Sequence, residues 1–247
     1  MQEEWSWTQV NNALPPPKDQ TPFDLCEMFS HLTLMEIKLR QSRTGDYKGS
    51  VGSLSTSHVM DWCPEGANGF AGVDIRDLNA RIARFLEVHG VAFEHAYGPQ
   101  LPWNPERFRA FERRRRNTVV KISPGTGADE FDIAVGNTDH DSLRRAIRRS
   151  PLLASIRLRV GFEDLGEDEM LPADAPYDED DGVVSLHTCV LTGFGSMNNV
   201  PYYEMLNSWG PNWGRRPQGI GRISVDDILS AWDYEVVELI GWCSRLC

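Results

Sequence analysis

The sequence predicts an α+β protein with two lobes and an active-site cleft between them. Helical patterns fill the first half of the chain, and patterns typical of strands fill the second half. The 247 residues are enough for one large domain or two closely packed small ones, and no internal repeat divides them. Helices and strands that are segregated along a chain are typical of α+β folds. Clefts between lobes are common places for a site.

Three helices are expected in the first half. The first opens at Asp24 and Glu27, which have the spacing of a capping box. Apolar residues then recur at helical spacing along one stripe: Leu25, Phe29, Leu32, Met35 and Leu39. The second helix is expected from Ile75 to His89. The third opens at Asn104, which caps it ahead of Pro105.

The second half alternates between strand patterns and turns. Residues 156–160 alternate strictly between apolar and basic side chains, as a half-buried strand does. Residues 183–194 and 202–206 are further β-rich runs, separated by a predicted turn at 195–199. A short helix is expected from Asp141 to Arg148.

The charge of the chain limits its partners. A formal charge of −11 and a pI of about 5.0 argue against nucleic acid as a partner. No apolar run is long enough to cross a membrane, and the first residues lack the pattern of a signal peptide. Ten carboxylates lie between Glu163 and Asp181, without a basic residue among them. This acidic segment is interpreted as a solvated surface loop.

The cysteines do not predict a disulfide framework or a metal site. Their number is five, which is odd, and their spacing does not repeat. Cys243 and Cys247 lack a second pair of ligands nearby, so no zinc site is expected. The sequence indicates no cofactor.

One cysteine, one histidine and one asparagine have contexts that suit nucleophilic catalysis. Cys26 falls at the start of the first predicted helix, where backbone N–H groups and the helix dipole stabilise a thiolate. His187 lies on a predicted strand that runs into a glycine turn, and Asn207 follows the next strand. A thiol, a base and an amide that orients the base form the Cys-His-Asn version of a catalytic triad.

The motifs around these residues resemble those of the papain and cathepsin family of cysteine proteases. Gln20 precedes Cys26 by six residues, as in the segment that opens those catalytic domains. The stretch 187–195 is similar to the family's histidine strand. The block 207–210 reads Asn-Ser-Trp-Gly, and Trp-Gly follows at 213–214. The resemblance covers nearly the whole chain in the same order.

The resemblance implies a papain-like fold and a peptidase mechanism. Residues 13–112 would form the helical lobe and residues 113–247 an antiparallel, barrel-like lobe, with the first residues packing on the latter. Cys26 would attack the peptide carbonyl, His187 would move the proton, and Asn207 would orient His187. Gln20 would help to hold the oxyanion, and Trp209 would shield the contact between Asn207 and His187.

The chain departs from the family around the cleft. Asp24 replaces a glycine and Glu27 replaces a tryptophan beside Cys26, so two carboxylates oppose the thiolate. Across the cleft, Val73 aligns with a glycine that would pair with the substrate backbone, and a shift of one residue would put Gly72 there. The residues expected to contact substrate are therefore Asp24, Gly72, Val73 and Trp209.

Two further functions stay open beside peptide hydrolysis. A catalytically weak or inactive protein could use the same fold as a binding or regulatory module, and an acyltransferase could resolve the thioester with an amine. The expected partners are a peptide or protein substrate and a protein inhibitor or regulator. If the chain is a protease, its acidic segment predicts a preference for basic substrates through electrostatic steering.

The expected location is the cytoplasm, with a secreted or vacuolar mature form as the alternative. Phe23 and Phe70 stand where the resemblance places two paired cysteines. Loss of those disulfides suits a reducing compartment.

Overall fold

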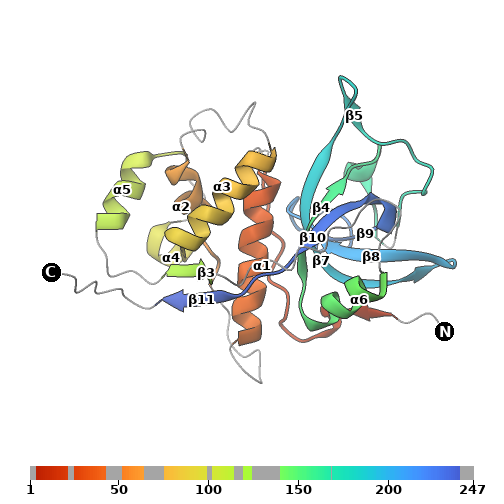
Figure 1. The fold of residues 1–247 in the computed structure, drawn as a ribbon, viewed down its shortest axis with the longest axis horizontal. Helices are drawn as coiled ribbons and strands as arrows, with labels where there is room; N and C mark the ends of the chain where they lie inside the picture. Colours follow the sequence, from red (N-terminus) through yellow and green to blue (C-terminus); the bar gives the residue numbers. More distant parts are fainter. Residues whose placement is uncertain are drawn as a thin grey trace. The chain divides into compact units, whose positions relative to one another are not determined.

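The computed structural model describes residues 4–21, 25–42, 52–63, 75–98, 102–113, 119–123, 140–167 and 169–239. The chain divides into two compact units. Unit 1 comprises residues 1–21 and 128–233, and unit 2 comprises residues 22–127 and 234–247. Unit 1 is built on antiparallel strands and unit 2 mainly on helices, so the predicted α+β class is confirmed (Figure 1).

Unit 1 centres on a six-stranded antiparallel sheet in the order β10-β4-β7-β8-β9, with β1 paired to β7. Its strands are β1 Trp5–Ser6, β4 Leu152–Arg157, β7 Leu186–Met197, β8 Val200–Leu206, β9 Ile220–Ile223 and β10 Ile228–Trp232. Strand β7 pairs with β1, β4 and β8 and is buried over most of its length. Strand β7 is therefore the central strand of the sheet in unit 1.

One helix and the N-terminal segment pack on this sheet. Helix α6, His140–Arg149, buries Leu143, Ala146 and Ile147, whose spacing puts them on one face toward β7. The 3-10 turn η1, Trp7–Gln9, lies against β7, and the indole N–H of Trp7 donates to the Ile147 carbonyl at 2.6 Å. These side chains belong to one core cluster with residues of β4, β7 and β8.

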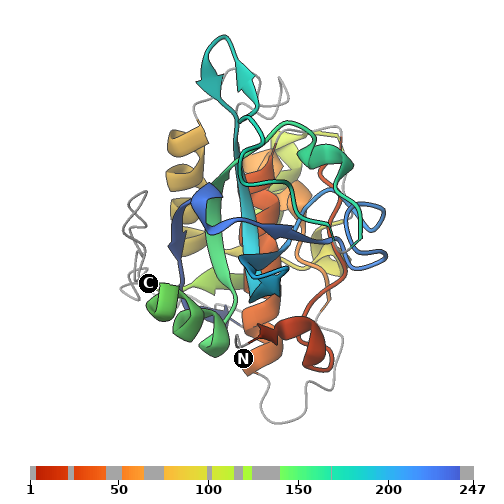
Figure 2. The same ribbon diagram turned by 90° about the vertical axis from the view of Figure 1, so that its right-hand side faces the viewer.

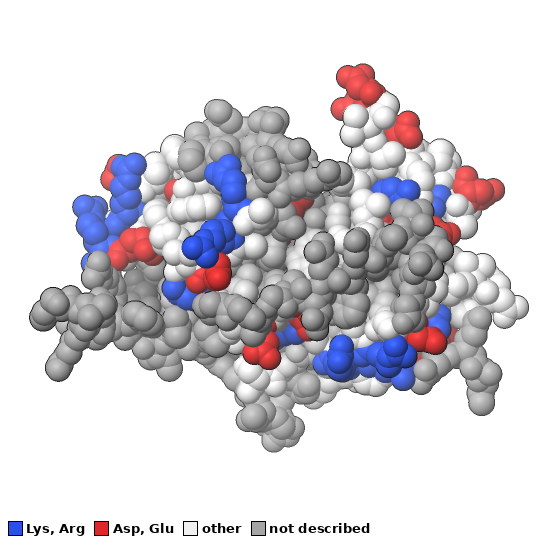
Figure 3. Space-filling view, in the orientation of Figure 1, with Lys and Arg blue, Asp and Glu red and all other residues white. Residues whose placement is uncertain are grey.

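The acidic segment lies on the surface of unit 1. It includes the turn η3, Phe162–Asp164, and β5, Glu179–Asp180, which pairs with β6, Val183–Val184. All of its described carboxylates are exposed, which confirms the interpretation as a solvated surface segment. The β5–β6 hairpin projects from the unit (Figure 2), and acidic side chains gather at its end (Figure 3).

Two strand predictions need correction. The strand expected at 156–160 is β4, which begins at Leu152 and ends at Arg157. Its first residues are buried and continuously apolar, so the alternation that the prediction used is absent there. The turn expected at 195–199 consists of Asn198 and Asn199 alone. Their φ angles of 53° and 66° suit the two-residue turn of a β-hairpin. Strand β7 consequently extends to Met197, and β6 is separate from it.

Unit 2 combines five helices with a small sheet among its described residues. The helices are α1 Cys26–Ser42, α2 Thr56–Trp62, α3 Ile75–Val88, α4 Glu94–Tyr97 and α5 Pro105–Arg113. The sheet has the order β11-β3-β2, from Val236–Leu239, Val119–Ile122 and Val91–Ala92. Strands β3 and β11 pair with each other, so both belong to unit 2 although they follow the lobe boundary expected at residue 112.

The helices of unit 2 follow the predicted signals closely. The apolar stripe of α1 is fully buried. The side chain of Asn104 accepts hydrogen bonds from the backbone N–H groups of Glu106 and Arg107, which confirms it as the cap of α5. Helix α3 ends at Val88, one residue before the expected end, and Gly90 follows with a φ of 74°.

A buried ion pair holds the loop that precedes β5 to the end of β4. Arg159 Nε donates to Asp227 Oδ1 at 2.7 Å, and the two side chains are 5% and 7% exposed. Arg159 Nη1 also donates to the backbone carbonyls of Ala173, at 2.9 Å, and Ala175, at 2.5 Å. One guanidinium thus satisfies a buried carboxylate and two loop carbonyls.

Replacement of Arg159 by methionine is expected to lower the free energy of unfolding by about 3–5 kcal/mol, because it leaves a buried carboxylate unpaired. The double variant Arg159→Met with Asp227→Leu should recover most of this loss. Urea denaturation measures both. The matched control is Arg157→Met, which removes a partly exposed guanidinium and should cost at most about 1 kcal/mol. An equal loss in control and test would contradict the role of the pair.

A neutral histidine occupies the aromatic core of unit 2. The backbone N–H of Ala92 donates to His58 Nδ1 at 3.0 Å, so this nitrogen carries no proton. Rings from α3, α4 and α5 surround the imidazole, with centroids 4.6 to 5.5 Å away: Phe85, Tyr97, Phe108 and Phe111. Burial lowers the pKa of His58 below its ordinary value, although Glu112 opposes the shift.

The stability of the protein is expected to fall as the pH drops below about 6.5, because the unfolded chain then binds a proton that buried His58 resists. His58→Asn preserves an acceptor near Ala92 but does not titrate there. It should lower the melting temperature at pH 7.5 and weaken the difference between pH 7.5 and pH 5.5. His95→Asn, at an exposed histidine, should keep the full difference. Unchanged pH dependence in His58→Asn would refute the assignment.

Candidate active site

His187 and Asn207 are brought together by neighbouring strands of unit 1. His187 is the second residue of β7, and Asn207 directly follows β8. The two strands are antiparallel, with Val190 opposite Leu206, so this end of β7 lies beside the end of β8. His187 Nε2 lies 2.8 Å from Asn207 Oδ1. The structure therefore joins two of the four residues that the resemblance assigned to catalysis.

A backbone contact fixes the orientation of this pair. The N–H of Ser208 donates to Asn207 Oδ1 at 2.8 Å, so the atom facing His187 is an acceptor. His187 must then carry a proton on Nε2 and donate it to the amide oxygen. This leaves Nδ1 as the nitrogen that can accept another proton.

Aromatic rings cover the pair. The Trp209 ring lies 5.1 Å from the His187 ring, and Phe162 lies 6.3 Å from His187 and 5.6 Å from Trp209. His187 and Asn207 are each 3% exposed. A hydrogen bond in such apolar surroundings is stronger than one in water. Trp209 thus lies against the His187 ring.

Gln20 belongs to the same unit and is held by Ser208. The backbone N–H of Gln20 donates to the Ser208 carbonyl at 2.8 Å, and Ser208 Oγ donates to Gln20 Oε1 at 2.5 Å. Because the side-chain oxygen is engaged, the amide NH₂ is the group that Gln20 can offer to an oxyanion. Ser208 was not among the predicted site residues, although it belongs to the same four-residue block as Asn207.

Cys26 is the first residue of α1 in unit 2, one position earlier in the helix than expected. Its thiol is 1% exposed and donates to Glu27 Oε2 at 3.3 Å. Glu27 is itself 1% exposed, so this carboxylate next to the thiol is largely shielded from solvent. A carboxylate this close opposes the charge of a thiolate.

The other predicted site residues lie outside the described residues. These are Asp24, which is also the expected cap of α1, Gly72 and Val73. Two further cysteines are described, Cys63 and Cys189, and both are buried thiols that form no disulfide. Burial raises the pKa of Cys189 far above its usual range, so it is a poor nucleophile.

The described residues contain neither a metal site nor a membrane-spanning helix. No group of three or more histidine, cysteine, aspartate or glutamate side chains there is placed to hold a metal ion. No described helix combines the length and the apolar character needed to cross a membrane.

Comparison with known proteins identifies the family. A family model described as papain family cysteine protease matches residues 1–228, so the chain belongs to this family. Among curated proteins it is similar to probable cysteine protease RDL6 of Arabidopsis thaliana, with 27% identity over 86% of this chain and 52% of that protein. It is also similar to zingipain-2 of Zingiber officinale, with 24% identity over 83% and 80%. Zingipain-2 is matched over most of its length, but the chain spans only about half the length of relatives such as RDL6.

Solved structures show the same fold. The bromelain protease from Ananas comosus, in complex with the E-64 inhibitor, matches 94% of this chain and 98% of its own at a TM-score of 0.65 and 18% identity. The proform of a ragweed pollen cysteine protease matches 94% and 64% at a TM-score of 0.65 and 19% identity. The predicted papain-like fold is confirmed. The comparisons do not support the expected cytoplasmic location.

Removal of the carboxylate charge beside Cys26 is expected to shift thiol alkylation toward lower pH by up to about one pH unit, because a negative charge nearby disfavours the thiolate. The variants are Glu27→Gln and Asp24→Asn, and the measurement is the rate of Cys26 alkylation by iodoacetamide against pH. Glu87→Gln on α3 removes one charge elsewhere in unit 2 and should leave the profile in place. If neither site variant moves the profile, the carboxylates do not restrain this thiol.

Proposed function

We propose that the chain hydrolyses peptide bonds through Cys26, His187, Asn207 and Gln20. The observation that carries the proposal is the buried 2.8 Å hydrogen bond from His187 Nε2 to Asn207 Oδ1. It fixes one imidazole tautomer and leaves Nδ1 to serve as the base, which is the arrangement that a thiol nucleophile requires. Membership of the papain family supports the assignment of Cys26 as that nucleophile.

In this mechanism, the Cys26 thiol transfers its proton to His187 Nδ1, and the thiolate attacks the carbonyl carbon of the peptide. The tetrahedral intermediate collapses by breaking the C–N bond, and His187 gives its proton to the departing amine. Water then attacks the thioester and loses a proton to His187. The C–S bond breaks, which releases the carboxylic acid, and His187 returns the proton to the Cys26 sulfur.

Asn207 and Gln20 act on the charges that these steps create. When His187 is protonated, its Nε2–H still donates to Asn207, so the ring does not rotate between the two proton transfers. The Gln20 amide is directed by Ser208 to donate to the oxyanion, a contribution worth about 2.7–4 kcal/mol for comparable donors. Asn207 and Ser208 are therefore positioning residues, whereas Gln20 would contact the reacting group.

A second candidate function is a binding or regulatory protein with weak or absent turnover. The contact from Cys26 to Glu27 favours it, because a thiol that donates to a buried carboxylate is less available as a thiolate. In that case the cleft would hold a peptide or a protein inhibitor without cleaving it.

An epoxide probe such as E-64 is expected to label Cys26 alone among the cysteines. The thiolate sulfur opens the epoxide to form a thioether, and the released oxygen takes a proton. Labelling in His187→Ala should be slower by about 10²–10⁴-fold, because the base that activates the thiol is lost. Peptide mass spectrometry measures both the position and the rate.

The matched control is His140→Ala, which removes another histidine of unit 1, one that lies against Tyr203 at 3.3 Å. Its labelling rate should equal that of the unaltered chain. Equal labelling of Cys26 in His187→Ala and His140→Ala would reject the triad. Selective labelling without hydrolysis of any peptide would favour the binding protein.

A further inference from the structure

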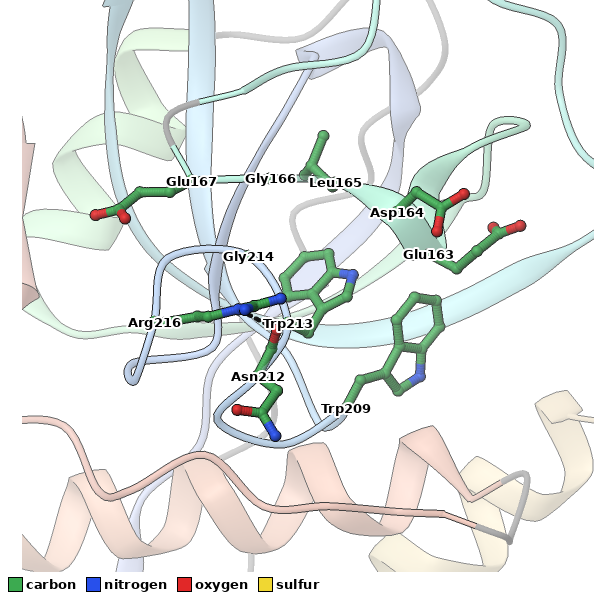
Figure 4. A pocket seen from close by; sticks show the side chains of 10 residues that line it. All are labelled: Glu163, Asp164, Leu165, Gly166, Glu167, Trp209, Asn212, Trp213, Gly214 and Arg216. Atoms are coloured by element: carbon green, nitrogen blue, oxygen red, sulfur yellow. Dashed lines mark hydrogen bonds between the residues drawn. The ribbon is translucent and has the colours of Figure 1, made fainter.

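A cavity of about 610 Å³ opens in unit 1 beside the proposed catalytic base. Its lining comes from two segments: the acidic turn that includes Glu163 and Asp164, and the loop after β8 that includes Trp209, Asn212, Trp213 and Arg216 (Figure 4). Trp209 also contacts His187, with 5.1 Å between the ring centroids. A peptide held at His187 therefore passes close to this cavity.

Two tryptophan rings make an apolar surface within the cavity. Trp209 and Trp213 meet edge to face, with centroids 5.7 Å apart and planes at 86°. Trp213 is anchored because its indole N–H donates to the Phe162 carbonyl at 3.2 Å. Beneath it lies Gly221 of β9, where an added Cβ atom would overlap the ring. The positions of the two indoles are thus set by the core of the unit.

The charges around this surface are unequal at its two ends. Glu163 and Asp164 lie at the end nearer Trp209, whereas the third carboxylate of the lining, Glu167, lies on the side of Arg216 (Figure 4). Arg216 lies toward the opposite end, where its Nε donates to the Asn212 carbonyl at 2.7 Å. The end beside His187 is therefore aromatic and negative.

We propose that this end of the cavity binds the side chain of a lysine or arginine in the substrate. The inference rests on the proposed function and names the substrate class of the same site. The methylene groups of such a side chain can lie on the indole faces while its charged end stays near water. Indole faces attract cations, and the two carboxylates of Glu163 and Asp164 add to that attraction.

Binding of one side chain in the cavity differs from the long-range electrostatic steering of basic substrates that the acidic segment predicts. Asp178 and Glu179 belong to that segment but do not line the cavity. Steering by the whole segment would raise the encounter rate of any basic peptide. A cavity that receives one side chain instead selects a single position of the peptide. Steering and binding in the cavity can therefore be distinguished by varying the position of the basic residue in the peptide and by substituting different carboxylates of the segment.

The test compares internally quenched peptides in which each position around the scissile bond carries lysine, arginine, norleucine or glutamate in turn. Norleucine has the apolar stem of lysine without its charge. At low salt, kcat/KM should be about 10-fold higher for lysine than for norleucine at one position, given a cation–π contact and weak exposed ion pairs. In 0.5 M salt the ratio should fall to about 3-fold.

Three variants assign the effect to the cavity. Glu163→Gln with Asp164→Asn should reduce the lysine preference to about 2-fold or less. Glu163→Lys with Asp164→Lys should reverse it, so that glutamate is preferred at that position. The matched control, Asp178→Asn with Glu179→Gln, removes the same charge from the hairpin and should leave the preference intact.

Two results would overturn the proposal: hydrolysis without a lysine preference at any position, or an equal loss of preference in the control variant. If no peptide is hydrolysed, the proposed function fails, and the cavity is then tested by binding alone. The probes are a lysine hexapeptide and its norleucine counterpart, titrated while tryptophan fluorescence is followed. About 10-fold tighter binding of the lysine peptide, lost in Glu163→Gln with Asp164→Asn, supports the cavity; equal binding rejects it.

Discussion

The hydrogen bond between His187 and Asn207 is the contact on which the proposed site in unit 1 depends. It forms because β7 and β8 run side by side after the two-residue turn at Asn198 and Asn199, with one shift of register between Leu191 and Gly193. The Ser208 backbone then decides which atom of Asn207 faces the imidazole. The aromatic rings of Phe162 and Trp209 keep water from competing for the bond. The strand pairing, the Ser208 backbone and the aromatic packing together hold the proton of His187 on Nε2.

Ser208 links this pair to Gln20, the proposed oxyanion donor. Its N–H holds Asn207, its carbonyl receives the Gln20 backbone, and its hydroxyl turns the Gln20 side chain. The chain segments around Gln20 and Ser208 are far apart in sequence, and Asp19 also forms a bridge with Trp209. One small polar residue therefore sets the orientation of two amides, and these amides would act on opposite charges during the reaction.

Much of the fold could be predicted from the sequence because its strongest signals are local. The stripe of α1, the Asn104 cap and the Gly90 stop each depend on residues within one or two turns of a helix. Strand β4 was misplaced because a strand buried on both faces loses the alternation that marks its ends. The sequence predicted His187, Asn207 and Gln20 through the family blocks. The contact of Cys26 with Glu27 and the place of Glu163 beside Trp209 depend on side-chain directions, which spacing does not determine.

In this cavity, shape and charge depend on different parts of the structure, and the shape depends on the glycine beneath Trp213. The shape of the aromatic surface is tied to β9, because any side chain at Gly221 would displace the indole. The charges lie on exposed residues of a turn, where substitutions cost little folding free energy, within about 0.5 kcal/mol. Evolution or design can therefore change which charge the cavity accepts while its shape stays constant. In this chain, the proposed substrate preference would therefore depend on exposed charges, whereas the shape of the cavity depends on the contact between Gly221 and Trp213.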